Sequence, residues 1–367
     1  MHRFLILLYA FLVVFALQSC SSNDDTDIET DPGDITEGTL YFPPINSGTW
    51  ETTSVTSLDW NESGLQPLLD FLEERDSQAF IILKDGKIVV EAYFNGGSST
   101  QNYPWFSAGK TLSAFMVGVA QQEGFLTLDD ASADYLGSGW SSLTEAEEEQ
   151  IKVWHHITMT TGMNFNVADT NCTNPECFTY LNVPGTFWYY HNAAYTLTQD
   201  IVEGAINQNF STYFNTKLRN VIGMDGAWLS VNFNSFYFST ARSMARFGLL
   251  NLNKGEWNGT KVLTDEVFFE EMTTTSQNLN PAYGYLWWLN GKNSYRAPGS
   301  TMLFQGNLIP GAPTDLIAGL GANDQKLYVV PSQNLVIIRL GADGGEALLG
   351  PSGFDVLLWE KINGLIN

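Results

Sequence analysis

The residues with the clearest chemical potential are Ser107 and Lys110, three positions apart in the stretch WFSAGKTLSAFMVGVAQQ. This spacing places two side chains on the same side of a helix. A serine hydroxyl is a weak nucleophile unless a base lies beside it, and a lysine is such a base only when burial lowers its pKa well below about 10.4. Because apolar residues follow Lys110 at helical spacing, we expect a buried amine beside the hydroxyl. The alternative is that Ser107 only caps a helix.

A second chemically useful pair is Tyr190 and Asn192, in the stretch PGTFWYYHNAAYTLTQ. Tyr-x-Asn occurs at three other places in the chain, but only here does it follow a Pro-Gly-Thr turn and precede small residues at a helix entry. A phenol in this position could relay a proton, and the amide could hold a substrate carbonyl. His191 lies between the two and raises a Ser-His-Asp alternative. We disfavour that alternative because no nucleophile elbow precedes Ser107.

Together these motifs resemble the penicillin-recognising serine hydrolases, and in particular the class C β-lactamases, esterases and 6-aminohexanoate-dimer hydrolases. Three further stretches carry the resemblance in the same order, over roughly residues 65–365: HITMTTGM (156–163), FSTARSMARFG (238–248) and YGYLWW (283–288). The resemblance implies that Ser107 forms an acyl-enzyme, that Lys110 with Tyr190 moves its proton, and that Asn192 orients the substrate. It implies no metal and no cofactor.

One family motif is altered. Counting back along the chain, the equivalent of the family's Lys-Thr-Gly or His-x-Gly is Gly319-Leu320-Gly321, so the cation that helps to hold a substrate carboxylate is missing. This departure argues against β-lactamase and DD-carboxypeptidase activity. The strand can still act through its backbone. The resemblance implies an oxyanion hole made by the N–H groups of Ser107 and Ala322, with Gly321 allowing the acyl group to approach.

We therefore predict a serine hydrolase that cleaves an ester or amide bond in a small-molecule substrate. Two alternatives remain open. One is a penicillin-binding, DD-peptidase or β-lactamase type of peptidoglycan enzyme, and the other is a non-catalytic surface binding protein on the same fold.

Hydrophobic periodicity indicates the elements that must position these residues. Strand patterns occur at both ends of the chain, and residues 125–275 show short helical patterns and polar loops. The resemblance implies an α+β fold of the β-lactamase/transpeptidase-like type, with an antiparallel sheet flanked by the first and last helices and a mostly helical lobe. A cleft between the two parts is the expected place for a site. The expected helices are 65–75, one from Ser107, 196–206, 239–252 and 354–366, and the expected strands are 79–83, 88–94, 315–320, 326–330 and 335–340.

The N-terminus indicates export. Residues 1–19 contain a short apolar run behind His2 and Arg3 and end at LQSC, which resembles a bacterial lipoprotein signal with Cys20 as the lipidated residue. Residues 20–45 are an acidic stretch that we expect to be a flexible tether, and residues 46–367 are the hydrolase domain. We expect a lipoprotein of the cell envelope, in the outer membrane or facing the periplasm, with the cell surface as a further option. Ordinary secretion is the alternative.

Charge and cysteine usage limit the partners. The chain has 17 basic and 40 acidic residues, a net charge of −23, which argues against nucleic acid and leaves the N-terminal lipid as the only expected membrane contact. Outside the cytoplasm, Cys172 and Cys177 are expected to form a disulfide. A calcium site on the polar loop around them is a disfavoured alternative, and the histidines are not spaced for zinc. We expect His155 and His156 to be structural and the glutamates at 145–149 to be solvated. The aromatic residues Trp105, Phe187, Trp188, Trp287 and Trp288 are expected mainly in the core, with one or two in an acyl pocket.

Overall fold

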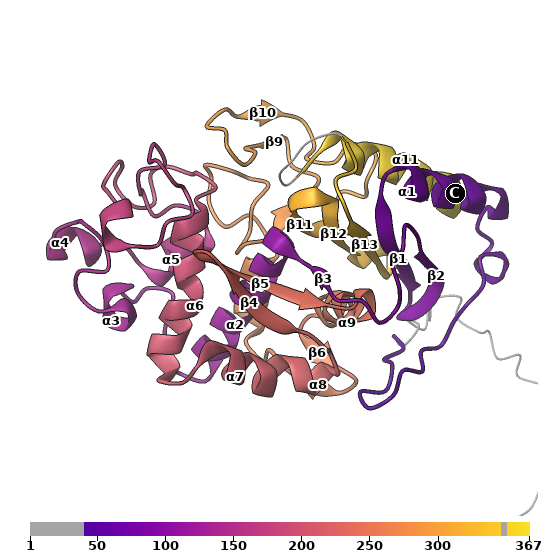
Figure 1. Ribbon diagram of the computed structural model, residues 1–367, viewed down its shortest axis with the longest axis horizontal. Coiled ribbons are helices and arrows are strands. Elements are labelled where there is room, and N and C mark those ends of the chain that lie inside the picture. Colours follow the sequence, from indigo (N-terminus) through magenta and orange to yellow (C-terminus); the bar gives the residue numbers. More distant parts are fainter. Residues whose placement is uncertain (1–39, 346–350) are drawn as a thin grey trace, which may run out of the picture. The chain divides into compact units, whose positions relative to one another are not determined.

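We describe a computed structural model of the chain, which covers residues 40–345 and 351–367 (Figure 1). The expected signal segment, Cys20 and most of the acidic tether lie outside the described residues, so these remain predictions. Among the residues that are described, no helix combines the length and the apolar character needed to cross a bilayer.

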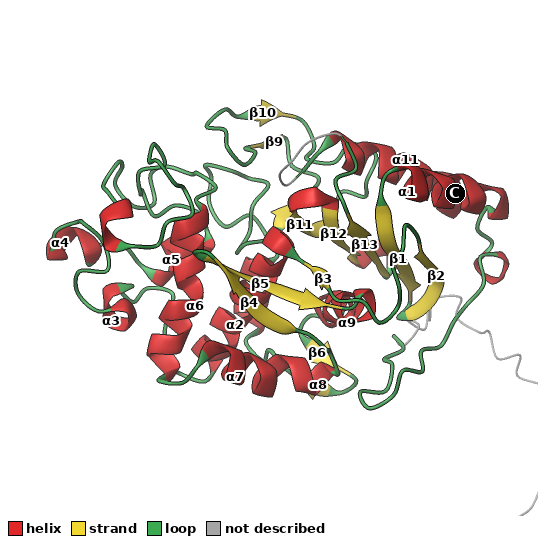
Figure 2. Cartoon of the chain, viewed as in Figure 1, coloured by secondary structure: helices red, strands yellow, loops and turns green. Residues whose placement is uncertain are grey.

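A six-stranded antiparallel sheet joins strands from the two ends of the described chain, in the order β2-β1-β13-β12-β11-β8. Figure 2 shows β2, β1, β13, β12 and β11 of this sheet. A hairpin turn at Asp85 and Gly86, which both have positive φ, joins the expected strands 79–83 and 88–94. β1 then pairs with β13 almost at the other end of the sequence, with Phe80 opposite Arg339. The predicted antiparallel sheet is confirmed. Its strands are β1 (Ser77–Lys84), β2 (Lys87–Tyr93), β8 (Trp288–Leu289), β11 (Ile317–Gly321), β12 (Gln325–Val330) and β13 (Leu335–Gly341).

Helices cover both faces of this sheet. On one face α11 (Gly353–Ile366) packs Trp359 against Tyr328 of β12, with the ring centroids 5.7 Å apart, and α1 (Leu65–Glu74) lies against α11 through Phe71 and Phe354. On the other face α9 (Ala241–Leu252) packs across β12 and β13. The flanking first and last helices are therefore as expected.

The remaining helices form the predicted helical region, with α2 at its centre. Every residue of α2 from Lys110 to Ala120 is buried, and α2 packs against α6. The helices of this region are α2 (Lys110–Gln122), α3 (Ala133–Leu136), α4 (Glu145–Glu148), α5 (Val153–Ile157), α6 (Asn192–Ile206), α7 (Phe210–Phe214), α8 (Asn220–Ile222) and α10 (Glu266–Met272). Shorter turns are η1 (Thr56–Leu58), η2 (Glu62–Gly64), η3 (Phe106–Gly109), η4 (Pro175–Cys177), η5 (Asn215–Arg219), η6 (Ala322–Asp324) and η7 (Pro331–Gln333).

A second, three-stranded sheet corrects the sequence-based picture of the middle region. β3 (Tyr103–Pro104), β5 (Asn234–Ser239) and β4 (Ala227–Val231) pair antiparallel in the order β3-β5-β4, where we expected only helices and loops. The strand signal was hidden because large apolar residues occupy both faces of β4 and β5, so the alternation of apolar and polar residues is lost. Smaller pairs are β6 (Glu256–Trp257) with β7 (Thr260–Lys261) and β9 (Ser294–Tyr295) with β10 (Phe304–Gln305).

One member of the acidic run is not solvated. Glu149 is exposed as expected, but Glu148 is 1% exposed, so the surface prediction is wrong for this residue. Its carboxylate accepts hydrogen bonds from the backbone N–H groups of Gly139 and Ser141 and from the Ser141 hydroxyl, at 2.7–2.9 Å. Three donors replace the water that the carboxylate loses on burial.

The loop around the two later cysteines is closed by the expected disulfide between Cys172 and Cys177. The polar side chains of the loop bond to one another or to the loop backbone, as where Asn171 donates its backbone N–H to Asp169. Within residues 40–345 and 351–367, no group of three or more His, Cys, Asp or Glu side chains is arranged to hold a metal ion.

Candidate active site

Ser107 and Lys110 meet where η3 runs into α2. Lys110 Nζ donates to Ser107 Oγ at 2.8 Å and to Asn192 Oδ1 at 3.2 Å. Ser107 is partly exposed, whereas Lys110 is 2% exposed. The proximity expected from the three-residue spacing is therefore present. Ser107 lies inside the 3-10 turn and the N-cap position of α2 is Gly109, so the geometry does not support a purely capping serine.

Burial determines the charge of the Lys110 amine. Desolvation lowers the pKa of Lys110 well below its ordinary value. The amine lies over the ring of Tyr195 at 4.0 Å and over that of Tyr190 at 4.9 Å. Within the described part of the chain, no carboxylate forms an ion pair with it. A neutral amine in this position can accept the proton of the Ser107 hydroxyl.

The Tyr190 phenol is the third group at this point. Burial raises the pKa of Tyr190 above its ordinary value, and a hydrogen bond with the Ser107 side chain acts in the opposite direction. Its ring stacks on Trp288, with centroids 5.7 Å apart, and lies edge-on to Tyr283 at 6.2 Å. The phenol therefore stays protonated and can donate or relay a proton.

The tryptophans singled out in the sequence support the site from behind. Trp105, Trp188, Trp287 and Trp288 are all at most 1% exposed, so they belong to the core as mainly expected. They hold aromatic rings in place and do not line an open acyl pocket. Phe187 is partly exposed and stacks on Phe165 with centroids 5.9 Å apart.

Asn192 reaches the amine because it is the first residue of α6, and His191 caps that helix. His191 Nδ1 accepts from the backbone N–H of Ala194 at 3.3 Å, and Nε2 lies 3.2 Å from the Asn164 carbonyl oxygen. Both ring nitrogens are thus engaged away from Ser107, which removes the geometric basis for a Ser-His-Asp triad.

The other two described histidines are also engaged with backbone. In α5, His156 Nδ1 lies 2.7 Å from the Ala194 carbonyl oxygen, and His155 Nδ1 accepts from the Lys152 N–H at 2.9 Å. Burial lowers the pKa of each histidine to about 4. Both are neutral structural residues at pH 7, as expected.

The edge of β11 packs directly on the turn that carries Ser107. A Cβ atom added at Gly321 would lie 2.4 Å from the Trp105 carbonyl oxygen and 3.2 Å from the Ala108 nitrogen, so only glycine fits. At Gly319, the position that the family resemblance assigns to a cation, an added Cβ would lie 3.3 Å from the Ala108 oxygen, which leaves little room there. Ala322, which is partly exposed, follows Gly321 directly and is thereby brought beside η3.

The two residues after Ala322 have an unusual backbone. Asn323 and Asp324 both have left-handed φ values, 56° and 55°, which are strained for residues other than glycine. Arg339 holds the first of them, because its Nη1 donates to the Asn323 carbonyl oxygen at 2.8 Å. Such strain persists only where neighbouring groups determine the conformation.

Buried hydrogen-bonding and charged groups hold Asp324, the second residue with a left-handed φ, in place. The Asp324 carboxylate accepts from the Ser352 hydroxyl at 2.8 Å and pairs with Lys326 at 3.1 Å, and Lys326 also pairs with Asp355 at 2.8 Å. Sequence reasoning missed this network. The signal was a lysine and an arginine inside otherwise apolar strands, because a buried charge requires a partner.

A sharp turn also precedes the nucleophile. Phe106 has φ 47°, again left-handed without glycine, and redirects the chain from the line of β3 into η3. Just before it, the Trp105 N–H donates to the Tyr237 carbonyl oxygen at 2.8 Å, which continues the pairing with β5. Because the residue with the left-handed φ is a phenylalanine and not a glycine, the sequence did not indicate this turn.

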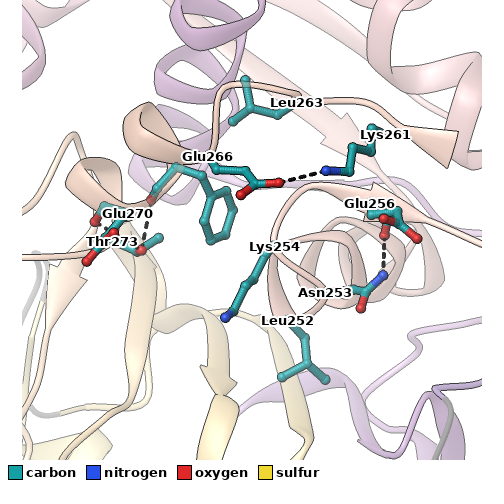
Figure 3. Close-up of a pocket in the computed structure, with 10 residues that line it drawn as sticks. Leu252, Asn253, Lys254, Glu256, Lys261, Leu263, Glu266, Glu270 and Thr273 are labelled. Atoms are coloured by element: carbon teal, nitrogen blue, oxygen red, sulfur yellow. Dashed lines mark hydrogen bonds and ion pairs between the residues drawn. The ribbon is translucent and has the colours of Figure 1, made fainter. Parts of the chain in front are cut away.

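A separate hollow of about 640 Å³ lies between the end of α9, the β6–β7 pair and α10 (Figure 3). Its charged lining residues include Lys254, Lys261 and Glu266, of which the last two form an ion pair at 2.7 Å. Gln122 lies at the far end of α2 from Ser107, and its side-chain amide donates a hydrogen bond to the Val262 carbonyl oxygen in the same region. Neither the Ser107, Lys110 and Tyr190 group nor Asn192, Gly321 or Ala322 lines this hollow, so it is not the candidate active site.

Comparison with known proteins gives one family and a set of similar structures. The beta-lactamase family matches residues 69–347, a range that contains every candidate residue from Ser107 to Ala322. An uncharacterised protein of Alkalihalophilus pseudofirmus is 24% identical over 316 residues, which cover 75% of this chain and 85% of that protein.

Among solved structures, a Bacillus anthracis protein described as a candidate 6-aminohexanoate-dimer hydrolase has a TM-score of 0.66 at 18% identity, covering 88% of each chain. A Bacteroides dorei protein described as a candidate beta-lactamase has a TM-score of 0.65 at 14% identity, covering 83% of this chain and 99% of that one. At these identities the likeness is one of fold, and it confirms the β-lactamase/transpeptidase-like α+β architecture expected from the sequence.

Proposed function

Because the chain belongs to the beta-lactamase family of serine hydrolases, we propose that it cleaves an ester or amide bond through an acyl-enzyme on Ser107. The observation that carries the proposal is the 2.8 Å hydrogen bond between Lys110 Nζ and Ser107 Oγ, made by a buried amine whose pKa is lowered. A surface lysine would be charged at neutral pH and could not accept the serine proton.

The first half of the reaction forms the acyl-enzyme. Ser107 Oγ attacks the substrate carbonyl carbon while its proton passes to the Lys110 amine. The Tyr190 hydroxyl, which is hydrogen-bonded to the Ser107 side chain, relays a proton to the leaving oxygen or nitrogen. The bond from the carbonyl carbon to that leaving atom then breaks. Asn192 holds both the amine and the substrate, since its side chain already accepts from Lys110.

The second half releases the acid. Water gives up a proton to the same Lys110 and Tyr190 pair and attacks the acyl carbon, and the proton returns to Ser107 Oγ as the ester bond to serine breaks. In both halves the backbone N–H groups of Ser107 and Ala322 stabilise the negative oxygen of the tetrahedral intermediate. The close packing of Gly321 on η3 and the network around Asp324 support this role, because preorganised donors need no rearrangement during the reaction.

A peptidoglycan or β-lactam substrate is the second candidate, because the family and a similar structure carry the beta-lactamase name. The lack of a cation at Gly319 and the tight packing there work against it, since a substrate carboxylate would have no partner at that strand. We therefore place neutral esters and amides first.

We also propose that Cys20 is lipidated and holds the domain at the cell envelope. The support is the sequence LQSC behind a short apolar run. Growth with a labelled fatty acid tests this. Label should enter the wild-type protein and not a Cys20→Ala variant, and equal labelling of both would refute the proposal.

The catalytic proposal is tested by intact-mass spectrometry of the protein exposed to a fluorophosphonate, to p-nitrophenyl acetate and to a penicillin. We expect a fluorophosphonate adduct on Ser107 and turnover of the ester, and neither in a Ser107→Ala variant with an unchanged melting temperature. A stable penicillin adduct on Ser107 would favour the second candidate. Equal ester turnover by wild type and variant would refute Ser107 as the nucleophile, and binding without turnover or adduct would indicate a non-catalytic protein.

A further inference from the structure

The three-stranded sheet beside Ser107 turns an apolar face toward solvent. Successive residues of a strand point to opposite faces, and here Trp228 and Tyr237 point inward with ring centroids 5.2 Å apart. Their neighbours in sequence point outward. Leu229 and Val231 are 49% and 46% exposed, and Phe236 is partly exposed. The solvent face of an antiparallel sheet is ordinarily polar, so this face calls for an explanation.

The strand register connects this face to the nucleophile. Leu229 of β4 is paired with Phe236 of β5, and the chain beyond β3 continues along β5 so that the Phe106 ring lies edge-on to Phe236 with centroids 5.5 Å apart. Phe106 is covalently joined to Ser107. Figure 2 shows the strands β3, β5 and β4 that carry these residues. The apolar surface thus runs across two strand spacings, about 10 Å, from β4 to the residue that precedes the nucleophile.

A neighbouring row extends the same surface. Phe238 of β5 is paired with Pro104 on one side and Ala227 on the other. We use the name apolar face for this set of outward-pointing residues: Pro104, Phe106, Ala227, Leu229, Val231, Phe236 and Phe238. Asn234, opposite Val231, is the polar member at its edge. No acidic or basic side chain belongs to either row.

The charge of the surroundings indicates what the face accepts. The chain has a net charge of −23, which disfavours anionic substrates, and Gly319 stands at the position that the family resemblance assigns to a cation for a substrate carboxylate. An anionic ligand is therefore disfavoured, and a ligand that lies along the apolar face meets apolar side chains and no charged partner there.

We propose that the apolar face binds the hydrocarbon chain of the acyl group in a neutral ester or amide of medium chain length. The inference rests on the proposed function, because it places the chain of the substrate that acylates Ser107. It adds the class of substrate and names the residues that select it. The length limit comes from the two strand spacings, about 10 Å, between the line of β3 and β4, the strand at which this sheet ends.

The test compares kcat/KM for p-nitrophenyl acetate, butyrate, octanoate and laurate, each kept below its aggregation concentration. A fully buried methylene contributes about fourfold to binding, and one covered on a single side about twofold, so octanoate should exceed acetate by ~60-fold. Laurate should bring little further gain, because its outer methylenes pass the edge of β4.

A double variant, Leu229→Ser with Val231→Ser, should lower the octanoate-to-acetate ratio by about tenfold, since both outward side chains lose their apolar surface. Both positions are well exposed, so the fold should persist. The matched control is Val267→Ser on α10, which removes an equally apolar side chain that is 67% exposed at a distant site and should leave the ratio unchanged.

The outcomes separate the inference from the proposed function. A flat chain-length profile with normal labelling of Ser107 overturns the inference and leaves the serine hydrolase intact. A ratio that falls equally in the control also overturns it. If the wild type is a dimer that the double variant dissociates, the apolar face is an interface between copies and the inference fails. Absence of labelling and of turnover for every ester refutes the proposed function itself.

Discussion

Replacing Lys110 by methionine should make the protein inactive and, near neutral pH, more stable. In the folded state the amine is buried, and desolvation lowers its pKa, whereas in the unfolded chain it has the ordinary value of about 10.4. Below that pH the unfolded state binds one proton more than the folded state. Stability therefore rises with pH, by about 1.36 kcal/mol per unit, wherever the folded amine is neutral and the unfolded amine is charged.

The methionine side chain of the variant has no proton to lose, so this slope disappears. Between pH 7.5 and 9.5 the wild type should gain stability relative to Lys110→Met, by about 1.4 kcal/mol for each pH unit over which the folded amine is neutral. At pH 7.5 keeping the amine neutral costs the wild type more than the two hydrogen bonds to Ser107 and Asn192 contribute, at about 1 kcal/mol each, so the variant should be the more stable protein.

The measurement is the free energy of unfolding by urea for both proteins across this pH range. Every other titrating group is common to the two, so its contribution cancels in the difference. Hydrolysis of p-nitrophenyl acetate, measured in parallel, should fall by about 10²–10⁴-fold in the variant because the base is gone. In the wild type kcat/KM should decline toward acid pH as the amine becomes protonated.

A difference in stability that does not change with pH would refute the reasoning. It would mean that the Lys110 amine is charged in the folded protein over the whole range. A charged amine cannot accept the serine proton, so the proposed mechanism would fall with it.

Three further predictions concern other parts of the site and its surroundings. Tyr190→Phe keeps the ring that stacks on Trp288 but removes the hydroxyl that relays the proton. Steady-state kinetics should therefore show kcat reduced by about 10²–10⁴-fold, with little change in melting temperature. An unchanged kcat would contradict the proton-relay role of Tyr190. Replacing both Cys172 and Cys177 by Ser should lower the free energy of unfolding by ~2 kcal/mol in a denaturant titration, because the short disulfide loop no longer restricts the unfolded chain. Equal free energies of unfolding for the two proteins would show that the disulfide contributes nothing to stability. Glu148→Ala should lower the free energy of unfolding by ~3 kcal/mol in the same assay, because it leaves buried donors without an acceptor. The control Glu149→Ala removes an exposed carboxylate and should change the free energy of unfolding by less than ~0.5 kcal/mol. Similar values for the two variants would argue against a structural role for the buried Glu148 carboxylate.

Much of the fold was accessible from the sequence because helices and strands are indicated by local patterns. The apolar spacing after Lys110 predicted a buried helix, and α2 is buried from Lys110 to Ala120. The strand patterns at both ends predicted β1 and β13, and the structure pairs these two strands antiparallel in one sheet. Where the pattern was ambiguous the prediction failed. β4 and β5 carry apolar residues on both faces, and one of those faces is exposed, which no local rule anticipates.

Within the candidate site, some contacts could be predicted from the sequence and others could not. Ser107 and Lys110 lie one helical turn apart, so their contact follows from helix geometry and was determined by the sequence alone. The contact between Lys110 and Asn192, 82 positions later, depends on α6 packing against α2 and exists only in the folded chain. The family resemblance pointed to Asn192, but spacing could not.

What the tertiary structure alone decided is the environment of each group. Only folding removes water from Lys110, surrounds Glu148 with three donors, and holds the strained turn after Ala322 with charges from β12, β13 and the start of α11. Which groups exist, and which neighbours lie within one helical turn of them, follows from the order of the residues. Protonation state and strain are set by desolvation and by partners that are distant along the chain, and these arise only when the chain is packed.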